Sequence, residues 1–355
     1  MRSRRNRHVA AGSSRLCAHA RAAQGDDTTV PGRPSEEPID CVVIGAGPAG
    51  LSAARALTRQ GRSVVVLDKG RGPGGRLSSR RTGETRFDHG CKELTFREPE
   101  SSSDLREWIE AGVVAPWCPT LKDGSTAAPY HVGTPAMNQV IKHLARDLEV
   151  RFNARAVELR SCEAGWEIIQ HQGEVEVVAR SVIVAIPSPQ AVDLLTPIGF
   201  EGLDRIKDVS FTGIWSVLIE GPHPDEVGFE AAVEPCPEIS WLAAQAGKPG
   251  RASDGAWVAL ASHAWSTEHL EDDKSSVADA LGPICAGILG IEQATTTIAH
   301  RWRFGLTRTP LGAPTLVDPI TCVAVAGDWC LGPTIEDALQ SGTAAAHEID
   351  DLLSA

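Results

Sequence analysis

The chain has 355 residues, 42% of them hydrophobic, and carries a formal net charge of −12. This length suffices for a sizeable core in about two domains or one large one. The negative charge argues against nucleic acid as a partner. No apolar run approaches the roughly 18 residues of a membrane span, so we expect no membrane-spanning segment.

The first segment, residues 1–38, is rich in Arg, Ala and Ser and shows no hydrophobic periodicity. It lacks the apolar stretch of a secretory signal, so two interpretations stay open, a disordered extension and an organelle-targeting segment. The nine Cys are scattered without any C-x-x-C spacing, which favours reduced thiols and argues against a metal site. We therefore expect a cytoplasmic protein, or an organellar one if residues 1–38 are a transit peptide.

A glycine-rich turn follows. Residues 41–44 predict a buried parallel strand, and G-x-G-x-x-G then leads into a helix that extends to about Gln60. Gly45 suits the tight turn, Gly47 lets the backbone approach a pyrophosphate, and Gly50 lets the helix pack closely on the strand. Because both flanks have the required pattern, the motif predicts dinucleotide binding.

The next strand supports this prediction. Residues 63–67 form a second apolar run that ends at Asp68, where an acid hydrogen-bonds an adenosine ribose. Residues 70–76 are a second glycine cluster with two Arg, a loop rich in backbone N–H groups that suits an anion. The two glycine segments therefore predict one site for a phosphate-containing cofactor.

The middle of the chain changes character. Its pattern predicts an amphipathic helix at 134–148, antiparallel strands at 151–159, 166–170 and 175–178, and a buried parallel strand at 181–187. Residues 190–300 then lose the alternation of strands and helices, although runs such as 214–218 and 257–261 look like strands. This loss indicates a second domain.

The C-terminal segment returns to the first pattern. A strand at 322–328 ends in Gly-Asp, and a helix follows from about Gly332 to Leu353. Thr334 and Asp337 have the spacing of a capping box. A helix N-terminus concentrates positive potential, so it can hold the N1/C2=O edge of a flavin.

Together these motifs resemble the flavin-containing amine-oxidase superfamily, and more narrowly its renalase-like FAD-dependent oxidoreductases. The resemblance covers residues 39–353 and is strongest at both ends. It is carried by the first glycine motif with Asp68, and by R-G-P-G-G-R at 71–76, F-D-H-G at 87–90, A-W-S at 264–266, H-R-W-R at 300–303 and G-D-W at 327–329.

The resemblance implies a discontinuous, doubly wound Rossmann-like FAD-binding domain with an inserted antiparallel-sheet substrate domain. We expect residues 39–95, 134–190 and 301–355 in the first and residues 96–133 and 191–300 in the second. It also implies non-covalent FAD, with Asp68 on the adenosine ribose, Arg76 on the pyrophosphate and Asp328 on the ribityl chain. The cofactor-binding residues expected in all are Gly45, Gly47, Ala49, Gly50, Asp68, Lys69, Gly75, Arg76, Asp88, Val157, Asp328, Thr334 and Ile335.

The expected reaction is hydride transfer from a small reduced substrate, of dihydronicotinamide or amine type, to flavin N5. O₂ is the expected acceptor, with release of H₂O₂, and NAD(P) is an alternative co-substrate. Since the flavin carries the redox step, we name only His89 and Trp329 as catalytic candidates and expect Lys92 to be solvated. The single Tyr excludes a Tyr/Tyr amine cage, which favours a flat, conjugated substrate.

Three alternatives remain open on the same fold. An amine oxidase and a polyene desaturase would share the FAD-binding ends of the chain. A binder similar to the GDP-dissociation inhibitors would bind a protein partner without flavin.

Overall fold

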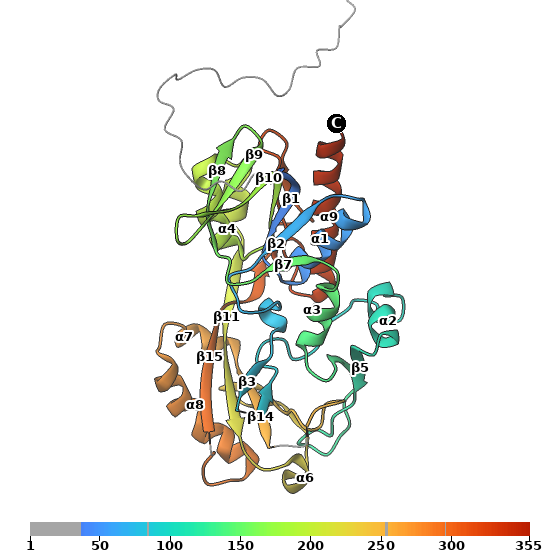
Figure 1. Cartoon of the computed structure of the whole chain (residues 1–355). Coiled ribbons are helices and arrows are strands. Elements are labelled where there is room, and N and C mark those ends of the chain that lie inside the picture. Colours follow the sequence, from blue (N-terminus) through green and yellow to red (C-terminus); the bar gives the residue numbers. More distant parts are fainter. Residues whose placement is uncertain (1–36, 84, 253–254, 295) are drawn as a thin grey trace, which may run out of the picture. The chain divides into compact units, whose positions relative to one another are not determined.

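The structure is a computed structural model that describes residues 37–83, 85–252, 255–294 and 296–355. The prediction for residues 1–38 lies almost wholly outside the described residues. Residues 38–355 cluster as one unit, in which two large sheets contribute to a shared hydrophobic core (Figure 1).

The first sheet brings together short apolar strands from distant parts of the sequence. Across the described residues its order is β16 (Leu316–Asp318), β17 (Val323–Val325), β10 (Val175–Val184), β1 (Ile39–Ile44), β2 (Val64–Leu67) and β7 (Glu149–Arg151), and β9 (Gly165–Gln170) and β8 (Ala156–Cys162) extend it from β10. The central strands run parallel, whereas β16, β9 and β8 join antiparallel. This order confirms the predicted Rossmann-like α/β fold.

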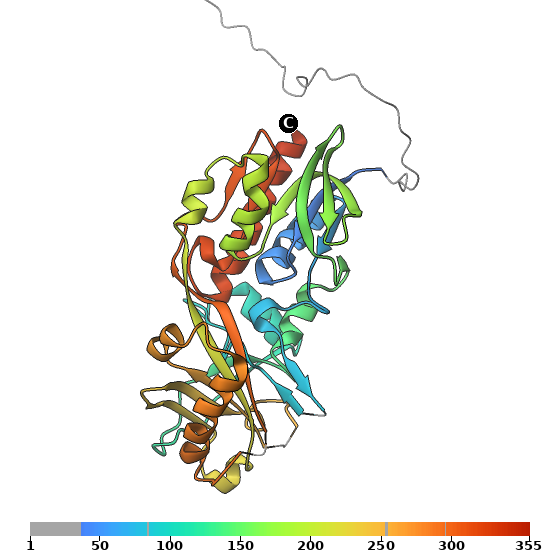
Figure 2. The ribbon, with the colours of Figure 1, turned by 90° about the vertical axis from the view of Figure 1, so that its left-hand side faces the viewer.

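Helices cover both faces of this sheet (Figures 1 and 2). One face holds α1 (Pro48–Arg59), α3 (Asn138–Leu144) and α9 (Ile335–Ser354), and the other holds α4 (Ser188–Leu195) and α5 (Leu203–Lys207). In β1, Cys41 and Val43 face the first group, and Val42 and Ile44 face the second. A strand covered on both faces needs apolar residues at every position, which explains the continuous apolar run at 41–44.

The second sheet is antiparallel throughout. In the described residues its order is β12 (Ala231–Cys236), β13 (Ile239–Ala244), β14 (Ala256–Ala261), β11 (Ser210–Glu220) and β15 (Thr296–Thr309). The helix α8 (Lys274–Leu289) packs on one face, against Trp215, Val217 and Ile219 of β11, and α7 (His263–Glu268) lies beside the same strand. Leu218 and Val258 lie on the opposite face with Phe87, and Trp241 of β13 belongs to the core shared with the first sheet.

Two short strand pairs, two α-helices and three 3₁₀-helices complete the described elements. The strand pairs and α-helices are β3 (Arg80–Thr82) with β4 (Thr85–Phe87), β5 (Val114–Trp117) with β6 (Tyr130–Gly133), α2 (Ser103–Glu110) and α6 (Pro224–Val227). The 3₁₀-helices are η1 (Gly75–Leu77), η2 (Thr196–Ile198) and η3 (Asp328–Cys330). Both strand pairs contribute aromatic side chains that pack against the second sheet opposite α8: Phe87 contacts the Val258 group, and Trp117 contacts Trp241. This inner face is where the candidate site lies.

Several segment boundaries differ from the predictions. The helix predicted at 134–148 is the shorter α3, because a residue that precedes proline, as Thr134 does, is disfavoured in helical conformation. The strands predicted at 175–178 and 181–187 are one strand, β10, whose first half pairs with β9 and whose second half pairs with β1. Periodicity separates the two halves because only the second is covered on both faces.

Two further boundaries fall inside or between elements. The strand predicted at 151–159 is interrupted, and Asn153 in the break has a φ of 56°. The domain boundary predicted at residue 301 falls within β15, which continues in the second sheet to Thr309. The division into two domains therefore stays a prediction.

Candidate cofactor site and active site

The turn between β1 and α1 has the geometry that its glycines predict. Gly45 has a φ of 114°, and a Cβ there would lie 2.4 Å from the Ala185 carbonyl oxygen. A Cβ on Gly50 would lie 1.9 Å from the Gly45 carbonyl oxygen, so any side chain would push α1 away from β1. A Cβ on Gly47, in contrast, meets nothing within 4 Å. The open side of Gly47 is the space that the backbone approach to a pyrophosphate requires.

The second glycine loop lies against this turn. Gly74 N–H donates to the Ala46 carbonyl oxygen over 3.1 Å, and a Cβ on Gly75 would lie 3.9 Å from Gly47 Cα. Asp68 at the end of β2 is fixed by the same segments, since its carboxylate accepts Ala46 N–H at 2.7 Å and Gly70 N–H at 2.6 Å. The two glycine segments and Asp68 thus form one cradle.

Arg76 and Asp328 join the cradle to the C-terminal segment. The Arg76 guanidinium forms an ion pair with Asp328 and donates to the Gly305 carbonyl oxygen over 3.2 Å. Thr307 Oγ1 donates to the other Asp328 oxygen over 3.1 Å. Although burial alone would lower the pKa of Arg76, the Asp328 carboxylate raises it above its usual value. Arg76 therefore stays charged.

The N-terminus of α9 follows Asp328 after the 3₁₀-helix η3 (Asp328–Cys330) and a short connection. The predicted capping box is present: Asp337 N–H donates to Thr334 Oγ1 over 3.1 Å, and Thr334 N–H donates to Asp337 Oδ2 over 3.0 Å. Ile335 is the first helical residue and is 8% exposed. The capping box thus satisfies backbone and side-chain groups at the helix start, where the helix concentrates positive potential.

The two catalytic candidates lie in different surroundings. Trp329 is 2% exposed and its Nε1 donates to the Ile186 carbonyl oxygen over 3.0 Å, the bonding of a core tryptophan. His89 is buried with its ring centroid 4.7 Å from that of His300 and 5.1 Å from that of Trp302. Burial, with a further contribution from His300, lowers the pKa of His89 to about 4. His89 is therefore neutral near pH 7, and the catalytic role of both residues stays a prediction.

Three other residues predicted to bind the cofactor, Ala49, Lys69 and Val157, lie outside the contacts that form the cradle. Ala49 is buried in α1, and Lys69 Nζ donates to Gln190 Oε1 over 3.0 Å. Val157 lies on β8 and is 41% exposed, whereas the contact that reaches Asp68 from this region comes from Ala154, whose N–H donates to the Asp68 carbonyl oxygen. Cofactor binding by Lys69 and Val157 stays a prediction.

Asp88, also predicted to bind cofactor, is engaged by the protein itself. One carboxylate oxygen accepts Ser79 Oγ at 2.6 Å and Met137 N–H at 3.0 Å. The other forms an ion pair with Arg251 and lies 4.0 Å from Lys248 Nζ. Burial alone would raise the pKa of Asp88, but Lys248, Arg251 and the hydrogen bonds from Ser79 and Met137 together lower it. Asp88 therefore ties three distant segments together as an ionised carboxylate.

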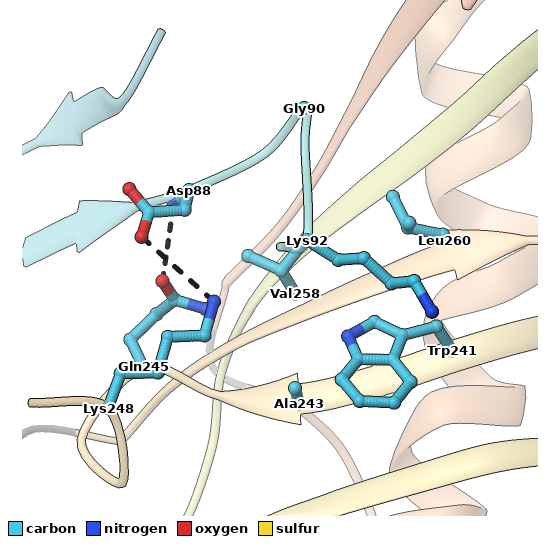
Figure 3. Close-up of a pocket in the computed structure, with 9 residues that line it drawn as sticks. All are labelled: Asp88, Gly90, Lys92, Trp241, Ala243, Gln245, Lys248, Val258 and Leu260. Atoms are coloured by element: carbon cyan, nitrogen blue, oxygen red, sulfur yellow. Dashed lines mark hydrogen bonds and ion pairs between the residues drawn. The ribbon is translucent and has the colours of Figure 1, made fainter. Parts of the chain in front are cut away.

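A small cavity lies beside Asp88 on the inner face of the second sheet (Figure 3). Its volume is about 10 Å³, enough for about one water molecule. The lining is Asp88, Gly90, Lys92, Trp241, Ala243, Gln245, Lys248, Val258 and Leu260. Sequence reasoning missed Gln245, Lys248 and Arg251, because nothing in their local pattern distinguishes them from residues of a solvated loop.

Two family profiles match the chain. Residues 43–108 match the NAD(P)-binding Rossmann-like domain, and residues 112–350, more than half of the chain, match the flavin containing amine oxidoreductase family. The chain belongs to the flavin-containing amine oxidoreductase family. This confirms the sequence-based expectation of an FAD-dependent oxidoreductase of the amine-oxidase superfamily. The family match does not distinguish the narrower renalase-like group within it.

Individual relatives are similar to parts or all of the chain. AofH of Mycobacterium tuberculosis, named as a flavin-containing monoamine oxidase, is 41% identical over 86 residues, which are 24% of this chain and 18% of that protein. The match thus spans less than a fifth of that relative's length.

Two solved structures share the fold over almost their whole length. Cyclohexylamine oxidase from Brevibacterium oxydans has a TM-score of 0.67 at 13% identity, covering 90% of this chain and 100% of that chain. Wild-type putrescine oxidase bound to putrescine has a TM-score of 0.64 at 13% identity, covering 88% and 99%. At these identities the likeness shows the fold alone. Among the helices of the described residues, none is both long and apolar enough to cross a membrane.

Proposed function

We propose that this chain is a renalase-like FAD-dependent oxidase of a small reduced substrate, with a dihydronicotinamide-type compound as the first candidate. The observation that carries the proposal is the cradle of two hydrogen-bonded glycine segments with an open side at Gly47. An ordinary strand-to-helix turn needs neither that opening nor a second glycine loop against it. The family match supports the same cofactor.

The residues of the cradle suggest how FAD would be held. Asp68, fixed by two backbone N–H groups, would bind the adenosine ribose, and the loop N–H groups with Arg76 would bind the pyrophosphate. Asp328 would bind the ribityl chain, and the α9 N-terminus at Thr334 would face the flavin edge where charge accumulates. The chemistry that FAD supplies when bound is acceptance of a hydride at N5 and delivery of the electron pair to O₂, which yields H₂O₂.

The protein's own contribution is positioning and exclusion of water. The inner face of the second sheet presents Trp241, Val258 and Leu260 to the cavity, so a substrate group there leaves bulk solvent. Neutral His89 lies at the neighbouring loop with Nδ1 unpartnered among the described residues. It offers a hydrogen bond without adding charge near pH 7.

An amine oxidase is the second candidate, and the family match together with the AofH similarity favours it. A GDP-dissociation-inhibitor-like binder would have no use for the open side of Gly47. A polyene desaturase would associate with membranes through an apolar mouth, which a vesicle flotation assay detects.

The testing experiment is an anaerobic visible spectrum of the purified full chain. We expect a flavin band that bleaches with NAD(P)H containing its less stable dihydro isomers and persists with clean NAD(P)H. Admission of O₂ should restore the band and produce H₂O₂. Bleaching by cyclohexylamine or putrescine instead would establish the amine oxidase, and a colourless protein that cannot be reconstituted with FAD would overturn the proposal.

A further inference from the structure

The cavity on the inner face of the second sheet borders a loop, at Gly90, whose backbone contacts Arg76 of the cofactor cradle's second glycine segment. Cys91 N–H donates to the Arg76 carbonyl oxygen over 2.8 Å, and a Cβ on Gly90 would lie 2.1 Å from that oxygen. The loop that borders the cavity at Gly90 therefore rests on Arg76, whose guanidinium is paired with Asp328. A substrate group in the cavity would lie close to the predicted flavin site.

The polar groups around this cavity carry an excess of positive charge. Asp88 provides one negative charge, whereas Lys248 and Arg251 provide two positive charges against the same carboxylate oxygen. The side chains of all three are 2–3% exposed, so bulk water does not screen the one excess positive charge. An uncompensated buried charge is costly, and an anionic or strongly accepting group in the cavity would offset it.

Gln245 adds a hydrogen-bond donor of fixed orientation. Its Oε1 accepts Asp88 N–H at 3.2 Å, which directs the amide nitrogen away from that bond. Gln245 is 2% exposed, and its Nε2 has no hydrogen-bond partner among the described residues. Burying an amide nitrogen without an acceptor costs free energy, because its hydrogen bond to water is lost and not replaced. Gln245 Nε2 is therefore free to donate to an acceptor that enters the cavity, such as a carbonyl or carboxylate oxygen.

The aromatic surface that could attract an amine already holds two ammonium groups. Lys92 Nζ lies 4.7 Å from the Trp241 ring centroid and 5.7 Å from that of Tyr130, and Lys248 Nζ lies 5.5 Å from that of Trp117. The three rings form one cluster with centroids 5.5–6.3 Å apart. Figure 3 shows the Lys92 side chain extended over Trp241. An external cation would have to displace Lys92 and approach Lys248.

We propose that the cavity is a subsite for a carbonyl or carboxylate oxygen of the substrate, and that Lys92 acts as an internal cation that excludes ammonium substrates. The subsite is small, so it takes only the oxygen-bearing group, and the body of the substrate lies outside it. The inference rests on the proposed oxidase function and narrows its substrate to neutral or anionic compounds. Specificity then has two sources: Lys92 repels ammonium compounds, and the Gln245 amide with the buried cations attracts an oxygen-bearing group.

The test compares three probes with the same ring and different head groups: cyclohexanecarboxylate, cyclohexanecarboxamide and cyclohexylamine. Binding to the FAD-loaded full chain is measured by isothermal titration calorimetry and by quenching of tryptophan fluorescence. We expect the carboxylate and the carboxamide to bind at least about tenfold more tightly than the amine. Equal or tighter binding of cyclohexylamine would overturn the proposal.

Lys92→Met removes the ammonium and keeps the aliphatic stem. The amine should then bind more tightly by a factor of roughly 2–30, the range of one cation–π contact, while the carboxylate weakens. Lys122→Met is the matched control, because Lys122 Nζ lies 4.8 Å from the Phe229 ring centroid and does not line the cavity. Unchanged head-group preference in Lys92→Met, or an equal shift in Lys122→Met, would contradict the role of Lys92.

The two proposals fail in distinguishable ways. Flavin content and bleaching are read in the visible spectrum, whereas head-group preference is read from probe binding without turnover. A yellow protein that bleaches with a reduced substrate yet prefers cyclohexylamine would keep the oxidase and reject the subsite. A protein that prefers the carboxylate but never bleaches would keep the subsite and reject the oxidase.

Discussion

The cofactor cradle and the cavity are formed by different kinds of chemical group. The cradle consists mainly of backbone groups from segments close in sequence, with the Asp68 carboxylate, and Gly45 and Gly50 admit no side chain there. The cavity is lined by charged, polar, aromatic and aliphatic side chains from segments as far apart as Asp88 and Leu260. Backbone geometry is specified locally by glycine, whereas the cavity exists only when distant segments are correctly packed.

The cradle and the cavity therefore respond differently to mutation. In the cradle, the position of a new Cβ decides whether the fold or only cofactor binding is lost. At the cavity, the balance of buried charge decides the outcome, because Asp88 neutralises only one of two cations. Three variants or conditions test this contrast, in order of expected effect.

The largest effect is expected for Gly50→Val. Its Cβ would lie 1.9 Å from the Gly45 carbonyl oxygen, so α1 must move from β1 and the free energy of unfolding should fall by about 3–5 kcal/mol or more. A Cβ on Gly47 in the same motif would meet nothing within 4 Å, so Gly47→Val should retain the fold while losing flavin. Denaturant unfolding of the apoproteins and the visible spectrum after FAD reconstitution measure the two effects.

Gly61→Ala serves as control, because Gly61 lies outside the motif at the end of α1 with a φ of 83°, where Ala costs about 1–2 kcal/mol from backbone strain alone. If Gly47→Val retained a full complement of flavin, the cradle would not be the pyrophosphate site. If Gly50→Val unfolded like the native chain, the close contact of α1 with the turn would be wrong.

The cradle could be predicted from sequence because its signals are local. Gly45, Gly47 and Gly50 stand between an apolar strand and an amphipathic helix, and Asp68 ends the next strand. The capping box at Thr334 and Asp337 could also be predicted from sequence, since both residues lie within one helical turn. Dinucleotide binding followed from these segments, and the fold class and the FAD cofactor followed from the family resemblance that they carry.

The cavity could not be predicted, because its residues meet only through tertiary packing. Lys248 and Arg251 lie in a loop after β13 whose sequence looks solvated, yet both side chains are buried against Asp88. Lys92 was expected to be solvated, and 39% of its side chain is exposed, but its ammonium lies over Trp241. Periodicity reports which face of an element is buried, and it carries no information on which charges pair across segments.

The second prediction concerns Asp88→Asn. The change removes the only carboxylate that faces Lys248 and Arg251 in the described residues around the cavity, so it leaves two buried cations without a counter-charge. The free energy of unfolding should fall by about 3–5 kcal/mol. Chemical denaturation at pH 7 measures it, with circular dichroism as the probe.

A double-mutant cycle sharpens the interpretation. Adding Lys248→Met to Asp88→Asn removes one of the two uncompensated cations, so the double variant should be more stable than Asp88→Asn alone. Arg303→Gln is the control, because Arg303 pairs with Glu271 at the surface and such exposed ion pairs contribute little to stability. A double variant less stable than Asp88→Asn would show that Lys248 stabilises by packing rather than by charge.

The smallest effect is expected from pH, through the buried His89 and His300 beside the cradle loop. Burial is the main cause that lowers the pKa of each from 6.5 to about 4. Between pH 6.5 and 4 the unfolded chain therefore binds more protons than the folded chain, so the free energy of unfolding falls as the pH falls. Allowing for coupling of the two rings, the loss should be about 1–3 kcal/mol.

The comparison that isolates this contribution is the pH dependence of wild type against His89→Gln and His300→Gln. Carboxylates titrate in the same range, but they are common to all three proteins and cancel in the difference. The variants should lose less stability between pH 7 and pH 4.5, and His89→Gln should show the larger reduction because His89 is the more buried ring. Parallel curves would mean that the imidazoles stay hydrated in the folded state. The inner face of the second sheet would then be open to water rather than the dry surface that hydride transfer at this site requires.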